Sequence, residues 1–166
     1  TSGKAQSSAV VELRLVADAN QNVQNGVNIK LLVRNNSKQV LTVRDIDDLC
    51  RLEVFDKNDW PVGPAPAPPR LLINNKAPHN DFQLKPHEER SVPFHLTQIM
   101  SNPREVYAEK NPELDRQSKT VPVMAKISAG DYRVRMYCVL MYSEKGATGF
   151  NSLSTRSDFV NVTLVK

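Results

Sequence analysis

The segment 129–142 constrains the fold more than any other part of the sequence. Its Gly130-Asp131 pair has the residues of a tight turn, and a long alternating pattern follows. One face of that pattern takes Tyr132, Val134, Met136, Cys138, Leu140 and Tyr142. Arg133 and Arg135 fall on the other face. Because side chains alternate between the two faces of a strand, this pattern predicts a long strand with one buried face, typical of an antiparallel β-sandwich.

Shorter alternating patterns recur along the rest of the chain, with turn residues between them. They cover 11–15, 27–33, 40–43, 50–54, 71–73, 92–96 and 160–164. Pro93 lies inside one of them and cannot donate to a strand ladder, so that strand is expected at a sheet edge or at a bulge. No helical patterns alternate with the strands, which favours a sandwich of seven to nine strands over a parallel α/β sheet.

Two segments interrupt the strand pattern. The first begins at Trp60 and holds five prolines as far as Pro69, which favour an extended polyproline II backbone. The second, about 97–120, is predicted to insert a short helix into the sandwich. Asn102 is a suitable N-cap for that helix, because Pro103 follows at the first helical position.

Length and charge limit the classes of function. The chain has 166 residues, which is enough for one domain with a core of its own. Its net charge is +4, but no run of Lys or Arg alternates with aromatics, so we expect no nucleic-acid partner. No apolar run approaches the roughly 20 residues of a membrane helix.

The chain begins Thr-Ser-Gly rather than with Met, which indicates a processed or trimmed product. Residues 1–8 are small and polar, like the tether that follows a removed signal peptide or lipid anchor. A trimmed boundary would look the same. We therefore divide the chain into a polar tether (1–8), which could join it to a membrane through the missing N-terminus, and a single sandwich domain (9–166).

Three segments together resemble bacterial immunoglobulin-like and fibronectin III-like domains. They are VNIKLLVRNNSKQVLTV, LKPHEERSVPFHL and ISAGDYRVRMYCV. In such domains a strand that ends in Asn-Asn or Asn-Ser opens a hairpin, and an Ala-Gly-x-Tyr turn opens a strand near the C-terminus. The order of these segments is also similar to that of the intracellular proteinase inhibitor family of bacilli. The resemblance implies an all-β, immunoglobulin-like antiparallel sandwich, and no inhibitory residue carries over.

The two cysteines, Cys50 and Cys138, both fall on the apolar face of their strands. They are either joined, as an inter-sheet disulfide could join them, or buried as free thiols that pack like small hydrophobic groups. A bridge over this separation would stabilise the fold by roughly 4 kcal/mol in the chain-entropy model and would require an oxidising compartment.

The sequence carries no recognisable catalytic or metal-binding pattern, so we expect neither an enzyme nor a cofactor. A Gly-x-Ser-x-Gly elbow and glycine-rich phosphate loops are absent. His79, His87 and His95 are evenly spaced, but they fall on turns and on an alternating strand, which does not favour convergence on a metal. They are expected to be exposed imidazoles.

The segment from Trp60 is the strongest candidate for a protein-binding site. A tryptophan beside a polyproline run presents a rigid apolar surface that loses little entropy on binding, and tryptophan is enriched at binding hot spots. The candidate residues are Trp60, Pro61, Pro64, Pro66, Pro68 and Pro69. The alternative is that this run packs across an open sheet edge and protects it.

A second candidate surface lies on the long strand and near the last one. Tyr137, Met141 and Phe159 point away from the inward set, so they meet either another layer of the sandwich or a docking partner.

We therefore expect a non-catalytic protein-binding or assembly module of an exported bacterial protein, located in the periplasm, on the cell surface or outside the cell. Its partner is a protein that the sequence does not identify. One alternative is a proteinase inhibitor that acts through the exposed loop 56–70. Another is a carbohydrate-binding accessory domain, although the chain has a single tryptophan.

Overall fold

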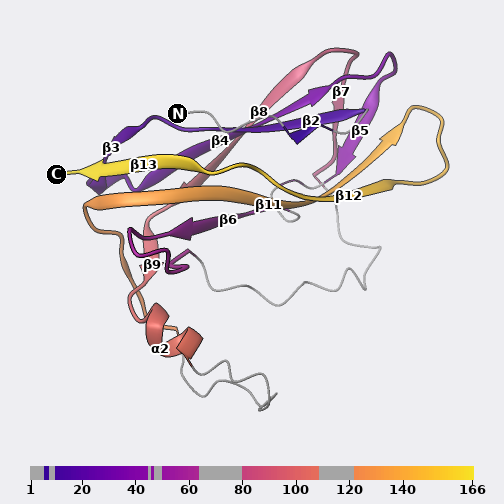
Figure 1. Cartoon of the computed structure of the whole chain (residues 1–166). Helices are drawn as coiled ribbons and strands as arrows, with labels where there is room; N and C mark the ends of the chain where they lie inside the picture. The colour runs from indigo at the N-terminus through magenta and orange to yellow at the C-terminus, as the bar shows by residue number, and fades with distance from the viewer. Residues whose placement is uncertain (1–5, 8–9, 45, 47–49, 64–79, 109–121) are drawn as a thin grey trace.

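Two mainly antiparallel sheets pack against each other and enclose one hydrophobic core, which confirms the predicted β-sandwich (Figure 1). The structure is a computed structural model, and it describes residues 6–7, 10–44, 46, 50–63, 80–108 and 122–166. Thirteen strands lie within these residues, and eight of them have four or more residues. Seven of these eight match predicted strands, the strand at Asn151–Arg156 was not predicted, and the strand predicted at 71–73 lies outside the described residues.

The smaller sheet has four strands. In sheet order they are β1 (Gln6–Ser7), β2 (Val11–Val16), β4 (Val27–Asn35) and β8 (Glu89–Leu96). Pro93 of β8 lies opposite Lys30 of β4. β8 is at the edge of the sheet, as the proline predicted. Gln6 and Ser7, which the sequence assigns to the tether, pair with β2.

The larger sheet is built around β11 (Gly130–Glu144), the long strand that the sequence predicts. Its other strands are β3 (Asn20–Asn22), β5 (Leu41–Arg44), β6 (Cys50–Phe55), β7 (Phe82–Leu84), β12 (Asn151–Arg156) and β13 (Val160–Val165). One side of β11 pairs first with β13 and then with β12, and its other side pairs first with β6 and then with β5. β7 extends the sheet beyond β5, and β3 joins β13 in parallel.

Alternation along β11 turns one row of side chains into the core. The buried residues are Tyr132, Val134, Met136, Cys138 and Leu140, whereas Tyr142 is half-buried. The Tyr132 hydroxyl donates to the carbonyl oxygen of Ser128 at 3.0 Å. A tyrosine at the start of a strand that bonds back to the preceding backbone resembles the tyrosine corner of immunoglobulin-type sandwiches.

The segment 35–40 does not form the hairpin that the motif resemblance implies. β4 and β5 lie in different sheets, so the chain crosses from one layer to the other. The Asn35 side chain is fully buried at this crossing and donates to the carbonyl oxygens of Gln39, Leu84 and Lys85 at 2.7–3.1 Å. These bonds compensate for the burial of the amide, and they make a layer crossing possible where the sequence suggests a simple turn.

The predicted helical insertion is confirmed in position. A ribbon of β9 (Gln98–Met100) and β10 (Met124–Lys126) carries the helix α2 (Pro103–Ala108), which Figure 1 shows beyond the end of the sheets. The helix begins at Pro103 as expected, and residues 109–120 of the predicted insertion lie outside the described residues. A short 3₁₀ helix, η1 (Val23–Asn25), precedes β4.

Candidate binding surfaces

Trp60, the centre of the predicted binding segment, is half-buried and packs against the core. Its backbone N–H donates to the Asp56 side chain at 3.0 Å, and its carbonyl oxygen accepts from the Asp56 N–H at 3.0 Å. The Arg104 guanidinium of α2 lies 5.9 Å from the centre of the indole ring. The tryptophan is therefore held in place from two sides.

The residues that follow Trp60 cover the free edge of β6. Pro61 forms a bridge with Phe55, and the N–H groups of Val62 and Gly63 both donate to the carbonyl oxygen of Val54 at 2.8 and 2.9 Å. These contacts favour the edge-protecting interpretation for residues 60–63. Pro64, Pro66, Pro68 and Pro69 lie outside the described residues, as does most of the loop proposed for protease inhibition.

A cavity of about 590 Å³ opens beside Trp60, between the body of the sandwich and the ribbon. Its walls include Trp60, Ile99 of β9, Arg104 of α2, Lys126 of β10 and Tyr132 of β11. The volume is in the range of small-molecule sites. Positive and negative side chains both line it, so the cavity has no strong preference for a charged ligand.

The outer face of the larger sheet carries a second, denser group of aromatic and charged side chains. We call it the arginine–aromatic face, and it consists of Arg51, Phe55, Arg133, Arg135, Tyr137, Arg156 and Phe159. Tyr137 lies opposite Arg51 of β6 and Arg156 of β12, and their guanidinium groups lie 5.0 and 4.7 Å from its ring centre. Cation–π contacts on both sides hold the tyrosine ring between two strands.

The other end of this face is organised around Phe159. Its ring meets that of Phe55 edge-on at 5.5 Å, and the guanidinium groups of Arg133 and Arg135 lie 4.5 and 4.8 Å from its centre. The sequence predicts that three apolar side chains point away from the core, and all three lie half-buried on this outer side: Tyr137, Met141 and Phe159. They therefore meet solvent and neighbouring side chains rather than a further sandwich layer.

Acidic side chains neutralise this face only in part. Glu53 accepts from Arg135 at 2.5 Å and also lies 3.5 Å from Arg156. Asp59 pairs with Arg133 at 2.6 Å. Two carboxylates thus face four guanidinium groups, and Arg51 forms no ion pair with the described residues. The outward positions of β6, β11 and β12 carry arginine, and neither they nor the outward positions of β13 carry lysine.

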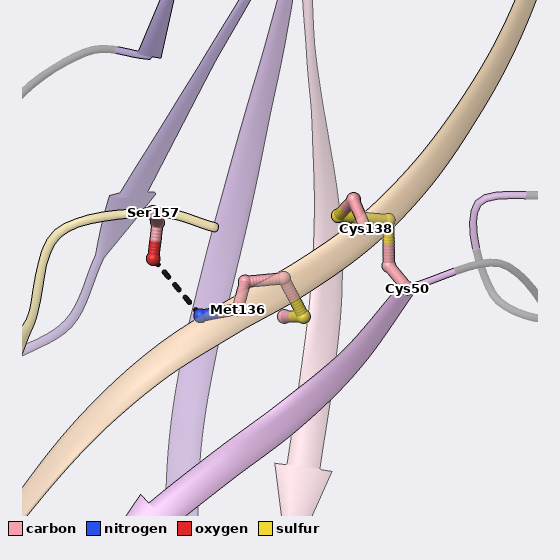
Figure 2. Close-up of a disulfide and its surroundings, with 4 residues drawn as sticks. All are labelled: Cys50, Met136, Cys138 and Ser157. Atoms are coloured by element: carbon pink, nitrogen blue, oxygen red, sulfur yellow. Dashed lines mark hydrogen bonds between the residues drawn. A yellow bond between two sulfur atoms is a disulfide. The ribbon is translucent and has the colours of Figure 1, made fainter. Parts of the chain in front are cut away.

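The two cysteines form a disulfide that joins adjacent strands of the same sheet (Figure 2). Cys50 and Cys138 are direct partners in the β6–β11 pairing, with their Cα atoms 4.1 Å apart. Of the two alternatives that the sequence left open, the cysteines are joined, but within one sheet rather than between two, because β6 lies beside β11 rather than across the core from it. The bridge indicates that the chain folds in an oxidising compartment.

The remaining sequence predictions concern metal binding and membrane-spanning segments. His87 and His95 are exposed, and His79 lies outside the described residues. Within the described part of the chain, no group of three or more His, Cys, Asp or Glu side chains could hold a metal ion. No helix there is long and apolar enough to cross a membrane.

Comparisons with known proteins identify no family. No family model matches the sequence, and no curated protein matches it. A β-glucosidase from Listeria innocua, solved with isofagomine, aligns with a TM-score of 0.37 and 15% identity over 96% of this chain and 16% of that chain. A β-glucosidase from Erythrobacter marinus aligns with a TM-score of 0.34 and 14% identity over 93% of this chain and 16% of that chain. Likeness at this level carries no argument about function.

The arginine–aromatic face was only partly visible in the sequence. Alternation places Arg133, Arg135 and Tyr137 on one side of β11, but it does not show that Arg51 and Arg156 lie on either side of Tyr137. That arrangement depends on which strands neighbour β11. The one available signal was the Arg-x-Glu-x-Phe alternation at 51–55, which is complementary in charge and aromatic character to Arg133-x-Arg135-x-Tyr137.

Proposed function

We propose that this chain is a non-catalytic protein-binding or assembly module of an exported bacterial protein, and that it binds its partner through the arginine–aromatic face. The disulfide supports export, and the motif resemblance supports a bacterial sandwich domain. The observation that carries the proposal is Tyr137, held between Arg51 and Arg156 on a sheet face with no lysine.

Tyrosine and arginine are enriched at the hot spots of protein interfaces, and lysine is depleted there. Side chains that are already fixed lose less entropy on binding than free ones. Cation–π contacts and the Glu53 ion pairs fix the guanidinium groups of this face before any partner arrives. The face therefore combines residue types that favour binding with the rigidity that strengthens it.

The test is affinity capture from a native envelope and secreted extract, followed by binding measurements with the captured partner in purified form. The bait with Arg51→Ala and Tyr137→Ala should bind that partner at least about tenfold more weakly than the wild-type chain does. Arg34→Ala is the matched control, because Arg34 is exposed on the other sheet, and it should bind normally. Equal binding by all three baits would contradict the proposal.

The cavity beside Trp60 favours a second candidate, a carbohydrate-binding accessory domain. Trp60 and Tyr132 line a space of suitable volume, and polar side chains border it. Because Trp60 is the single tryptophan of the chain, its fluorescence reports on the surroundings of this one residue, which lines the cavity.

This candidate predicts that titration with soluble glycans changes the Trp60 emission and that Arg104→Ala weakens the response about tenfold. Arg14→Ala, on the smaller sheet, should leave the response unchanged. Constant emission across a panel of plant, bacterial and host glycans would eliminate the carbohydrate candidate.

A further inference from the structure

The strand β12 presents a backbone edge next to the arginine–aromatic face. Within the described residues, β12 pairs with β11 on one side and with no strand on the other. Ser152, Ser154 and Arg156 are all exposed. The strand contains neither proline nor lysine, which are two common means of protecting an edge.

The hydrogen bonds around Met136 show which backbone groups of β12 face outward. The Met136 N–H donates to the Ser157 hydroxyl at 2.9 Å (Figure 2). The Met136 carbonyl oxygen accepts from the Ser157 N–H at 2.8 Å, so both groups of Met136 point toward the β12 side. Backbone groups alternate in direction along a strand, so Cys138 and Leu140 also point toward β12 and bond their partners Thr155 and Leu153.

The intervening residues of β12 must then direct their groups away from β11. These residues are Ser152, Ser154 and Arg156. Their three N–H groups and three carbonyl oxygens form a row that another strand can pair with.

Other strand edges of the sandwich are shorter or are blocked. β3 and β7 have three residues each. β8 is longer but carries Pro93 in its middle. The edge of β6 is bonded by Val62 and Gly63. Strand addition therefore has the fewest obstacles at β12.

The side chains on the two faces of β12 differ in chemistry, and this difference indicates which kind of strand can pair with its free edge. Leu153 and Thr155 turn toward the interior and are half-buried, and Leu153 packs against the core. On the outer flank, the Tyr137 hydroxyl lies 3.2 Å from the Ser154 hydroxyl. Arg156 is 51% exposed there and shares Glu53 with Arg135.

We propose that β12 accepts an extended segment of a partner protein as an added strand, and that this segment alternates apolar with acidic side chains. The apolar row would pack beside Leu153 and Thr155. The acidic row would lie beside Arg156, whose positive charge is only partly balanced because Glu53 is shared with Arg135. This inference rests on the proposed function, since it assigns the partner's chemistry at one border of the same face.

The probe is a short peptide that alternates valine with glutamate, titrated into the intact chain and followed by the backbone amide resonances. Binding should shift the Ser152, Ser154 and Arg156 amides and slow their hydrogen exchange. A peptide with lysine in place of glutamate should bind about tenfold more weakly, because it places like charges beside the Arg156 guanidinium.

Two variants of Ser154 separate strand pairing from side-chain effects. Both Ser154→Pro and Ser154→Ala remove the hydroxyl, but only the proline removes the outward N–H. That N–H forms no bond to β11, so the proline is compatible with the fold of an edge strand. Ser154→Pro should bind the glutamate peptide about tenfold more weakly than Ser154→Ala does.

Three results would overturn the inference: no binding of the glutamate peptide, equal binding by the two Ser154 variants, or a dimer of this chain in sedimentation that Ser154→Pro abolishes. The last result would make a second copy the occupant of the edge. A partner that no longer binds the Arg51 and Tyr137 bait but binds both Ser154 variants equally would contradict strand addition at β12. The same result would still support the proposed binding through the arginine–aromatic face.

Discussion

Replacing Cys50 and Cys138 together by alanine should lower the free energy of unfolding by about 4 kcal/mol. The disulfide closes a loop with a sequence separation of 88, so it restricts the unfolded chain far more than the folded one. It also joins the first residue of β6 to β11, the strand around which the larger sheet is built. The measurement is equilibrium unfolding in urea, followed by the fluorescence of Trp60.

A reduced wild-type chain is the control for this experiment, because it lacks the bridge but keeps both sulfur atoms. The cysteines are 5% and 1% exposed, so reduction should require that the chain first unfold. Reduced wild type should lose most of the 4 kcal/mol, and the alanine variant should lose slightly more because two small cavities remain. Equal stability of the oxidised and reduced chains would show that the bridge contributes little.

Replacing Gly26 by alanine should cost about 3 kcal/mol, for two reasons that act together. The backbone of Gly26 has φ 67° and ψ −164°, a conformation that is essentially limited to glycine. An added Cβ would also collide with the carbonyl oxygen of Leu96, at the end of β8 beside Val27. The cost is measured as the change in the free energy of unfolding in urea.

Gly146 provides a matched control for the steric part of this cost. It also has a positive φ, of 86°, but a Cβ there would meet nothing within 4 Å. Gly146→Ala should therefore cost about 1 kcal/mol, from backbone strain alone. If both substitutions lower the free energy of unfolding equally, the close approach of Leu96 to Gly26 does not contribute to the destabilisation.

The disulfide also bears on where the chain works. A bridge between two buried cysteines persists in oxidising compartments and is rare in the cytosol. It supports an extracytoplasmic location, and that location is where the proposed acidic, extended partner should be sought.

Several sequence predictions succeeded because they depend on neighbouring residues. The inward row from Tyr132 to Leu140 and the helix start at Pro103 both follow from local backbone preferences. The turn expected at Gly130-Asp131 is wrong, because these are the first two residues of β11 and pair with Leu164 and Thr163 of β13. Pro93 marked an edge strand for a similar reason, since the missing N–H is a property of one residue.

The errors arose where the answer depends on residues far apart in the chain. The Asn35-Asn36-Ser37 turn chemistry suggested a hairpin, but the buried Asn35 bonds to Leu84 and Lys85, about 50 positions away, at a crossing between sheets. The cysteines could be a bridge between two sheets or free thiols, because their alternation shows only that both face inward. Sequence spacing alone did not place β6 beside β11.

In the strands that it predicted, the sequence by itself determined which side chains face the core and which face outward, because the two-residue period of a strand is a property of its own backbone. The tertiary structure alone decided which outward rows became neighbours. Glu53 meets Arg135 across 82 positions, and Phe55 meets Phe159. Such contacts depend on the order in which strands join the sheet, and that order is set by the closure of long loops around one shared core.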